Sequence, residues 1–226
     1  MGHELLLASP VSTFKRLGEL IISASFWEIV ANSCLRILLG FLFGLAAGAI
    51  VAFLTAFNRA AYAFFSPAMN VVKATPVASF VVLAIVWVGS GNLSVLCTFL
   101  MVTPIVWTNV HAGLTTADPA LLEMAAAFRL PRKKVNSAIR IPALLPHLLS
   151  ALRVSLGFAW KAGVAGEVIA IPRGSIGTQL YTAKVTLDTV ELLAWTAVVI
   201  ILSVALERLM IFVTNLLAKR MEANAK

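Results

Sequence analysis

The sequence predicts an all-α polytopic membrane protein with about five transmembrane helices. Its 226 residues are 60% hydrophobic and only 12% charged, whereas soluble domains carry about 25% charged residues. Apolar runs such as Ile37–Phe57 and Val190–Leu206 reach or approach the roughly 20 residues that cross a bilayer core. The charged residues stand at the ends of such runs. These observations exclude an ordinary soluble domain and indicate one membrane domain over residues 1–226.

The first expected element is an N-terminal amphipathic helix ahead of the spans. Between Ser12 and Phe26, apolar side chains recur at helical spacing with charged side chains between them. A helix of this kind lies in the membrane interface. Five spans are expected after it, at about Val30–Ala56, Phe64–Val88, Leu93–Val110, Leu144–Ile171 and Val190–Leu217.

Glycine and proline mark the breaks and contacts of these spans. Gly40, Gly44 and Gly48 recur at four-residue spacing, which lets two helix backbones approach closely. We expect this face to pack on another helix; the alternative is the general tolerance of membrane helices for glycine. A turn is expected at residues 89–92 and a mixed loop at Pro172–Asp188.

The basic residues predict the orientation. The net charge is +8, and nine basic residues fall on the side of the Thr115–Arg140 segment and the C-terminus, against four on the other side. By the positive-inside rule, that segment and the C-terminus are cytoplasmic and the N-terminus is outside.

Two other uses of the charged and metal-ligating residues are not favoured. Basic and aromatic residues do not alternate as a strand-binding groove requires, so nucleic acid is not expected as a partner. Cys34 and Cys97 lie inside expected spans and far apart in sequence. We therefore expect two small core residues and not a disulfide or a metal site. The three histidines are scattered without ligand spacing, so no metal site is expected.

The longest polar stretch predicts a helical loop at about residues 115–142. Asp118 is a candidate N-cap and Pro119 suits the first helical position. This helix should end near Arg129, because Pro131 disfavours helix at the residue before it. A second, basic helix should then run from Pro131 to Ile139 and close at Pro142. The loop also carries apolar side chains that a solvated connector, the alternative interpretation, has little reason to carry.

In this loop the chain resembles the inner-membrane permease subunits of binding-protein-dependent ATP-driven importers. Their signature is E-A-A, three variable residues, G, nine variable residues and I-x-L-P. Glu123-Met124-Ala125 stands at E-A-A, Arg129 at the glycine, and Ile139 with Ile141-Pro142 at the end. Arg129 is the main departure, because glycine readily supplies positive φ at a helix C-terminus.

The resemblance extends along nearly the whole chain, to the branch that carries nitrate, sulfonates, taurine and bicarbonate. The segment LLASPVSTF resembles that branch's P-S-P entry, and Ser33, Arg36 and Gly40 match its S-L-x-R-x-x-x-G. The Pro76 to Gly89 and Leu156 to Glu167 segments resemble two further motifs. Members of that branch commonly start with one more span, so we expect that this span is absent or that the sequence was recorded from a late start codon.

The resemblance implies the type I importer permease fold and its partners in the bacterial inner membrane. Two permease subunits, identical or homologous, form one path for a small, anionic or polar solute delivered by an external binding protein. ATP and Mg are bound by a separate ATPase dimer, and this chain is not an enzyme; it has no G-x-x-x-x-G-K-[ST] phosphate loop. The implied ATPase-docking residues are Leu121, Leu122, Glu123, Met124, Ala125, Ala126, Phe128 and Arg129.

Ionisable residues in the spans are candidates for the translocation path. Such residues are costly in hydrocarbon and face the interior or a partner. Lys161, Glu167 and Arg36 are the candidates, suited to an anion. The alternatives are a local pair between Lys161 and Glu167, which their six-residue separation disfavours, and snorkelling of Arg36 to the membrane edge. Trp160 beside Lys161 is best explained by packing.

Two other function classes compete with the importer permease. An ATP-independent secondary transporter or channel would show pseudo-symmetry between the two halves of the chain, and the sequence has no internal repeat. A membrane scaffold without transport is the other. Nitrate, sulfonates, bicarbonate and small vitamin precursors all stay open as substrates.

Overall fold

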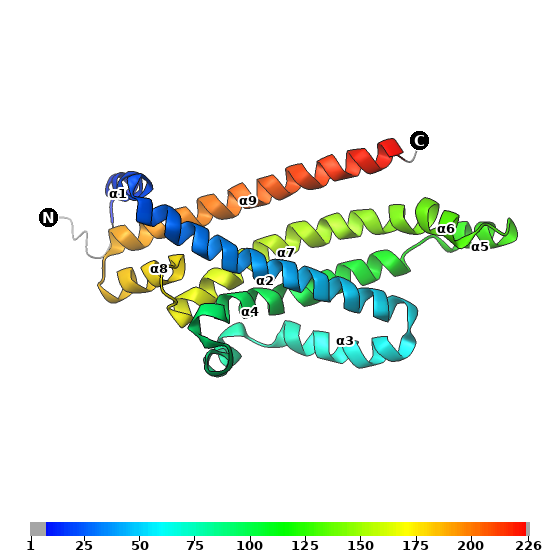
Figure 1. The fold of residues 1–226 in the computed structure, drawn as a ribbon, viewed down its shortest axis with the longest axis horizontal. Helices are drawn as coiled ribbons and strands as arrows, with labels where there is room; N and C mark the ends of the chain where they lie inside the picture. The colour runs from blue at the N-terminus through cyan, green and yellow to red at the C-terminus, as the bar shows by residue number, and fades with distance from the viewer. Residues whose placement is uncertain (1–7, 225–226) are drawn as a thin grey trace. The chain divides into compact units, whose positions relative to one another are not determined.

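The computed structural model describes residues 8–224, and every regular element in that range is a helix. The first part of LLASPVSTF and Lys226 lie outside the described residues. The all-α prediction is confirmed (Figure 1). The elements are α1 (Pro10–Ile22), α2 (Ala24–Phe57), α3 (Arg59–Ala74), α4 (Val77–Thr115), α5 (Pro119–Ala127), α6 (Arg132–Val135), the π-helical η1 (Asn136–Arg140), α7 (Ile141–Ala170), α8 (Ile176–Val185) and α9 (Thr189–Asn224).

Within the described residues, four helices are long and apolar enough to cross a membrane. They cover Ala24–Phe57, Ser79–Thr115, Arg132–Ala170 and Thr189–Leu216. Each corresponds to one of the expected spans, and their number supports a polytopic membrane protein. The remaining expected span, the second, differs from the prediction.

The second expected span is not one helix. α3 ends at Ala74, and Thr75 is extended, with φ −74° and ψ 122°. Pro76 explains the break, since a proline disfavours α-helical backbone at the residue before it. The chain reverses direction at Asn58, and α3 runs back beside the C-terminal half of α2 (Figure 1).

The turn expected at residues 89–92 is a sharp break inside α4. Helix lies on both sides, and Gly89 has φ 73° and ψ 164°. These values suit glycine, which has no Cβ to clash with the backbone. The break is therefore localised at a single residue, and no loop separates the two parts of α4.

The N-terminal amphipathic helix is shorter than expected. Ser9 caps α1 by accepting a hydrogen bond from the Val11 amide, and the helix stops at Ser23, which is extended. The expected Ser12–Phe26 helix is thus divided between α1 and α2. α1 buries Leu17 and Leu20 and leaves Phe14 69% exposed. This is an amphipathic helix as predicted, and its place in the membrane interface stays a prediction.

The chain divides into two units, each assembled from three segments. The first consists of Met1–Leu42, Pro76–Phe99 and Phe158–Leu206, and the second of Phe43–Thr75, Leu100–Gly157 and Glu207–Lys226. The first has a core cluster of Val81, Ala84, Leu93, Cys97 and Ala170. Cys34 and Cys97 are both free thiols.

Close glycine packing occurs in both units. In the first, a Cβ on Gly40 would lie 2.5 Å from the Val95 carbonyl oxygen. In the second, a Cβ on Gly48 would lie 2.6 Å from the Thr103 carbonyl oxygen. Carbon and oxygen atoms do not approach this closely, so both positions require glycine. The predicted helix packing is confirmed at these two residues.

Candidate docking loop and buried carboxylate

We call residues 115–142 the coupling loop, and the start of this loop follows the prediction. Asp118 caps α5, and its Oδ1 accepts a hydrogen bond of 2.9 Å from the Ala120 amide. Pro119 occupies the first helical position, where its missing N–H costs nothing because that group has no partner inside a helix. The predicted Pro119–Phe128 helix agrees with α5, which ends at Ala127 with Phe128 as its cap.

Arg129 closes α5 in the left-handed backbone conformation, with φ 49°. Its amide donates to the Ala126 carbonyl at 3.0 Å, and the Leu130 amide donates to the Ala125 carbonyl at 2.9 Å. This pair of bonds is the Schellman motif, which usually has glycine at this position. The geometry expected for glycine is therefore retained with arginine, at a cost of roughly 1 kcal/mol.

The second helix of the loop does not close at Pro142, so that expectation is wrong. It starts after Pro131 as predicted, but α6, η1 and α7 follow without interruption to Ala170. The Ile141 amide donates to the Asn136 carbonyl, five residues back. A proline ring in a helix clashes with the carbonyl four residues before it. The wider π-helical turn lies directly ahead of Pro142, where it relieves that clash.

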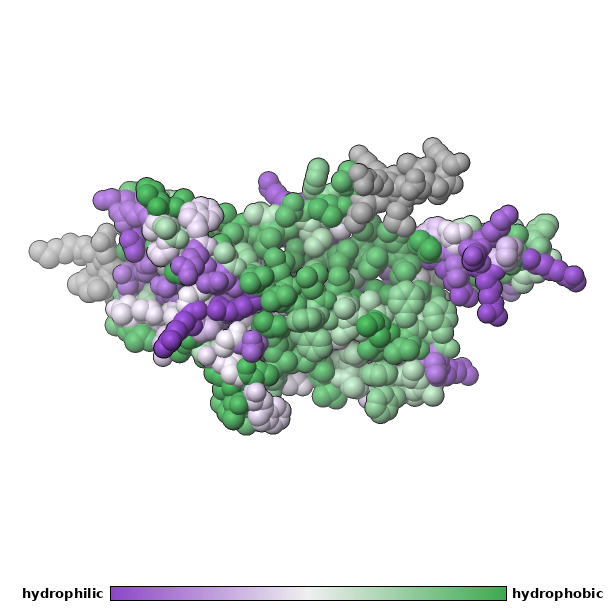
Figure 2. All heavy atoms as spheres, viewed as in Figure 1, coloured by the Kyte–Doolittle hydropathy of each residue, from purple (hydrophilic) through white to green (hydrophobic). Residues whose placement is uncertain are grey.

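The loop presents apolar side chains outward. Leu121 is 43% exposed, Met124 47% and Phe128 73%. Glu123 and Ala126 are also exposed, Leu122 is half-buried and Ala125 is buried. Ala125 thus lies on the buried side of α5 and does not contribute to its outer face. Figure 2 shows hydrophilic side chains gathered over α5 and α6, with apolar side chains over the adjoining long helices.

A different kind of site lies in the first unit, around the carboxylate of Glu167. This α7 side chain is fully buried. Its Oε2 accepts hydrogen bonds from the Ser33 hydroxyl at 2.8 Å and from the Gly177 amide at 3.2 Å. Its Oε1 lies 3.4 Å from Nη1 of Arg36. Helices α2, α7 and α8 therefore meet at one carboxylate, and only α2 is distant in sequence.

The start of α8 supplies the backbone donor of this site. Ser175 caps α8 through the Thr178 amide, and the Ile176 amide donates to the Ser33 hydroxyl at 2.9 Å. A Cβ on Gly177 would lie 2.3 Å from the Cβ of Glu167. The partial positive charge of a helix N-terminus stabilises a nearby anion. The closeness of Gly177 lets this helix end reach the carboxylate.

The expectation of a mixed loop over Pro172–Asp188 missed α8. The sequence did contain a signal for a helix start in Ser175, a typical N-cap residue. Gly177 follows it, and the structure places Gly177 in close contact with Glu167. A single glycine in a polar segment is more typical of a turn. The close contact with Glu167, which only the structure shows, explains why a glycine stands inside this helix.

Two of the three path candidates, Arg36 and Glu167, are brought together, and Lys161 lies apart from them. Arg36 pairs with Glu167, and its Nη2 also donates to the Arg173 carbonyl at 3.2 Å. Lys161 is exposed, with its Nζ 5.9 Å from the centre of the Phe158 ring. A local pair between Lys161 and Glu167 is absent. Arg36 has both of these partners within the chain, and its position relative to the membrane edge stays a prediction.

Trp160 is a packing residue, as the sequence suggested. Its side chain is 2% exposed, and its Nε1 donates to the Val199 carbonyl at 3.0 Å. The contact joins α7 to α9 within the first unit. A buried indole usually finds such a partner for its N–H group.

The long apolar helices, with α5 between α4 and α6, agree with the family of membrane proteins that the chain matches. The family described as the binding-protein-dependent transport system inner membrane component matches residues 40–223. The chain belongs to this family. The match covers both the coupling loop and Glu167, and it agrees with a multi-pass membrane protein.

Similar proteins belong to the branch that the sequence predicted. The permease protein SsuC of Bacillus subtilis, named for the transport of aliphatic sulfonates, is 28% identical over 79% of this chain and 65% of its own length. The taurine transport system permease protein TauC of Escherichia coli is 27% identical over 82% and 68%. The bicarbonate transport system permease protein CmpB of Synechococcus elongatus is 24% identical over 72% and 63%. The chain thus spans about two thirds of the length of these relatives.

Proposed function

We propose that this chain is the membrane-spanning permease subunit of an ATP-driven importer and that its coupling loop receives the ATPase. The observation that carries the proposal is the outer face of α5, where Leu121, Met124 and Phe128 are exposed beside Glu123. Exposed apolar side chains beside polar ones are typical of a helix that fits into a groove of a partner. Rigid-body movement of the ATPase would then reach α4 and the continuous α6–α7 helix through this loop.

The proposal includes the partners that family membership supports and the orientation that the basic residues predict. An external binding protein delivers a small anionic or polar solute, and a second permease subunit completes the path. ATP and Mg belong to the ATPase. The loop and the C-terminus face the cytoplasm. Lys161 is the candidate for the path, because it is exposed, whereas Glu167 and Arg36 satisfy each other inside the chain.

Charge reversal at Glu123 tests the docking role. With Glu123→Lys, the chain should still insert, but the ATPase should no longer co-purify with it and ATP-dependent uptake should fall to background. Glu28→Lys reverses an equally exposed charge on α2 and should leave both unchanged. Unchanged co-purification and uptake in Glu123→Lys would exclude the docking role, and uptake that continues without ATP would favour a secondary transporter.

Cysteine labelling tests the orientation. In a chain with Cys34 and Cys97 replaced by alanine, single cysteines are placed at two exposed positions, Ser137 and Lys184. A membrane-impermeant maleimide added to intact cells should label Lys184→Cys and should reach Ser137→Cys only after permeabilisation. The reverse pattern would place the loop outside and contradict the proposal.

A further inference from the structure

Phe57, at the end of α2, is the meeting point of three cavities in the second unit. Their volumes are about 290, 460 and 300 Å³, and Phe57 lines all three. The ring itself is 60% exposed. A large aromatic side chain that is exposed and surrounded by hollows marks a place where another molecule can bind.

Arginine side chains surround this phenylalanine without acidic partners. Arg59 lines the first cavity, and Arg132 and Arg140 line the second. The Arg140 guanidinium lies 5.5 Å from the centre of the Phe57 ring. No aspartate or glutamate lines any of the three cavities, and the ion pairs found among the described residues involve only Arg16 and Arg36. The cluster thus carries positive charge that the chain itself does not neutralise.

The second and third cavities adjoin each other at shared lining residues. Phe57, Asn136 and Arg140 line both. The third adds Phe53, Leu114, Ile141 and Leu144, all apolar. Phe53 is 49% exposed and Ile141 44%, on helices apolar enough to cross a membrane. An arginine-lined hollow therefore adjoins an apolar groove.

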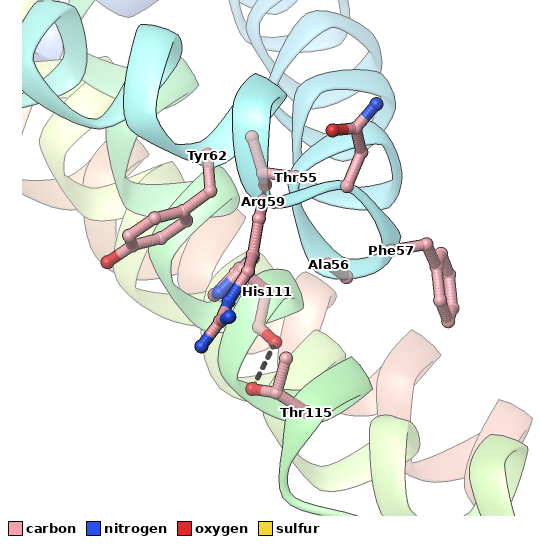
Figure 3. Close-up of a pocket in the computed structure, with 8 residues that line it drawn as sticks. Thr55, Ala56, Phe57, Arg59, Tyr62, His111 and Thr115 are labelled. Atoms are coloured by element: carbon pink, nitrogen blue, oxygen red, sulfur yellow. Dashed lines mark hydrogen bonds between the residues drawn. The ribbon is translucent and has the colours of Figure 1, made fainter.

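The first cavity adds a polar flank on the other side of Phe57. Figure 3 shows Arg59 extending from the start of α3 alongside His111 of α4, with Thr115 one turn further along. Nδ1 of His111 lies 3.0 Å from the Thr55 hydroxyl, and the Tyr62 ring stacks on the imidazole at 5.0 Å. These contacts hold the imidazole in place while Arg59 lies over the cavity.

We propose that this cluster binds one anionic phospholipid. The phosphate occupies the cavity of Arg132 and Arg140, and one acyl chain lies in the groove of Phe53, Leu114, Ile141 and Leu144. Basic pockets at the ends of membrane helices recognise anionic headgroups, and the groove selects a lipid over a free anion because it removes apolar chain from water. The proposal does not depend on the transport function.

Native mass spectrometry of the purified full chain tests the site. Phosphatidylglycerol is the probe, and phosphatidylcholine with the same acyl chains is the neutral comparison. We expect one tightly retained phosphatidylglycerol, with affinity about fivefold lower in Arg140→Gln and in Arg132→Gln, the effect of one basic residue at a membrane surface. Arg140→Lys should retain most of the affinity. Arg59→Gln should show a smaller loss.

The matched control removes equal charge beside the site. Lys133 and Lys134 lie on the same short helix as Arg132 but line none of the three cavities, so Lys133→Gln and Lys134→Gln should retain the lipid. Equal loss in these variants, or equal retention of phosphatidylcholine, would overturn the proposal. Thermal unfolding of each variant without lipid shows whether the fold is intact.

Two soluble probes separate the lipid from other sources of phosphate. Inorganic phosphate and glycerophosphoglycerol, which has the headgroup but no acyl chains, should not displace the bound lipid even in large excess. Displacement by either would show a site for a free anion and would contradict the lipid assignment. Leu144→Asn should weaken the binding of phosphatidylglycerol and leave any binding of inorganic phosphate unchanged.

Discussion

The Glu167 site and the coupling loop place polar and apolar groups in opposite ways. Glu167 is ionisable and fully buried, and it has Ser33, Arg36 and Gly177 as partners. The face of α5 is apolar and exposed, with Phe128 73% accessible. A buried charge needs partners within the chain, and an exposed apolar face needs one outside it. The first site is complete in one chain, and the second is the face that we propose a partner covers.

The two arginine environments extend this comparison. Arg36 has a buried carboxylate as its partner, whereas Arg140 lies over an aromatic ring without any carboxylate. Arg36 therefore belongs to the structure of the chain. Arg140 has charge left for another molecule, which is the basis of the lipid proposal.

The largest effect is expected from removing the buried carboxylate. Glu167→Ala leaves Arg36 and the Ser33 hydroxyl without their acceptor, and breaking a buried ion pair from one side costs about 3–5 kcal/mol. We expect a free energy of unfolding lower by that amount in a denaturant titration in mixed micelles. Glu207→Ala, at an exposed position of α9, should stay within about 0.5 kcal/mol of the original chain. Equal stability of the two variants would exclude a structural role for Glu167.

A smaller loss is expected from crowding the same site. Gly177→Ala places a Cβ 2.3 Å from the Cβ of Glu167, and overpacking costs about 1–3 kcal/mol. A Cβ on Gly157 would meet no neighbouring atom within 4 Å, so Gly157→Ala should be neutral or slightly stabilising. Thermal unfolding of the two variants distinguishes close packing from a general effect of glycine. If Gly177→Ala were as stable as Gly157→Ala, α8 would not be held against Glu167.

A stabilising change is expected in the coupling loop. Arg129→Gly relieves positive φ without altering the outer face of α5, so the chain should gain about 1 kcal/mol or less. ATPase co-purification should be unchanged. Ala126→Gly is the control, because glycine inside a helix costs roughly 1 kcal/mol. A loss of ATPase binding in Arg129→Gly would assign the arginine side chain to the interface.

The smallest effect is expected at the ion pair between Arg16 and Glu191. Arg16 lies outside the membrane-spanning helices, and hydrogen bonds to Glu191 and Glu19 raise its pKa above the usual arginine value. When the pKa of an arginine is higher in the folded chain, the stabilisation is fully present below the pKa of the unfolded chain. It is lost only as the pH rises through the pKa of the folded chain. The contribution of Arg16 to the free energy of unfolding therefore stays constant between pH 6 and 10. Arg16→Gln should cost about 1 kcal/mol or less, because exposed pairs are screened. If Arg16→Gln lowered the free energy of unfolding as much as Glu167→Ala, burial would not explain the difference between the two ion pairs.

The local features of the coupling loop could be predicted from the sequence because they depend on neighbouring residues. Asp118 caps the helix that Pro119 starts, and Arg129 takes the backbone conformation expected at the glycine position. The end of the following helix could not be predicted. Pro142 is usually a stop signal, but the turn before it widened and the helix continued.

The buried site could be predicted only in part. Arg36 and Glu167 are both predicted from the sequence to be costly in hydrocarbon, and Ser33 stands in the same family motif as Arg36. Nothing in the sequence marks Ser33 or Gly177 as a partner of Glu167. Lys161, six residues from Glu167, was an equal candidate in sequence and proved to be exposed. Which cation meets a carboxylate depends on contacts between α2 and α7, which are more than 100 residues apart.

From the sequence alone it could be predicted that this chain is helical, crosses a membrane several times and carries a helical loop at residues 115–142. These properties follow from composition, apolar run length and the chemistry of residues a few positions apart. Tertiary structure decided that Glu167 is enclosed by Ser33, Arg36 and the start of α8, and that three arginines surround Phe57. The reason is physical: burial and charge pairing depend on distances in space, and in a helical bundle the nearest partners come from segments far apart in the chain.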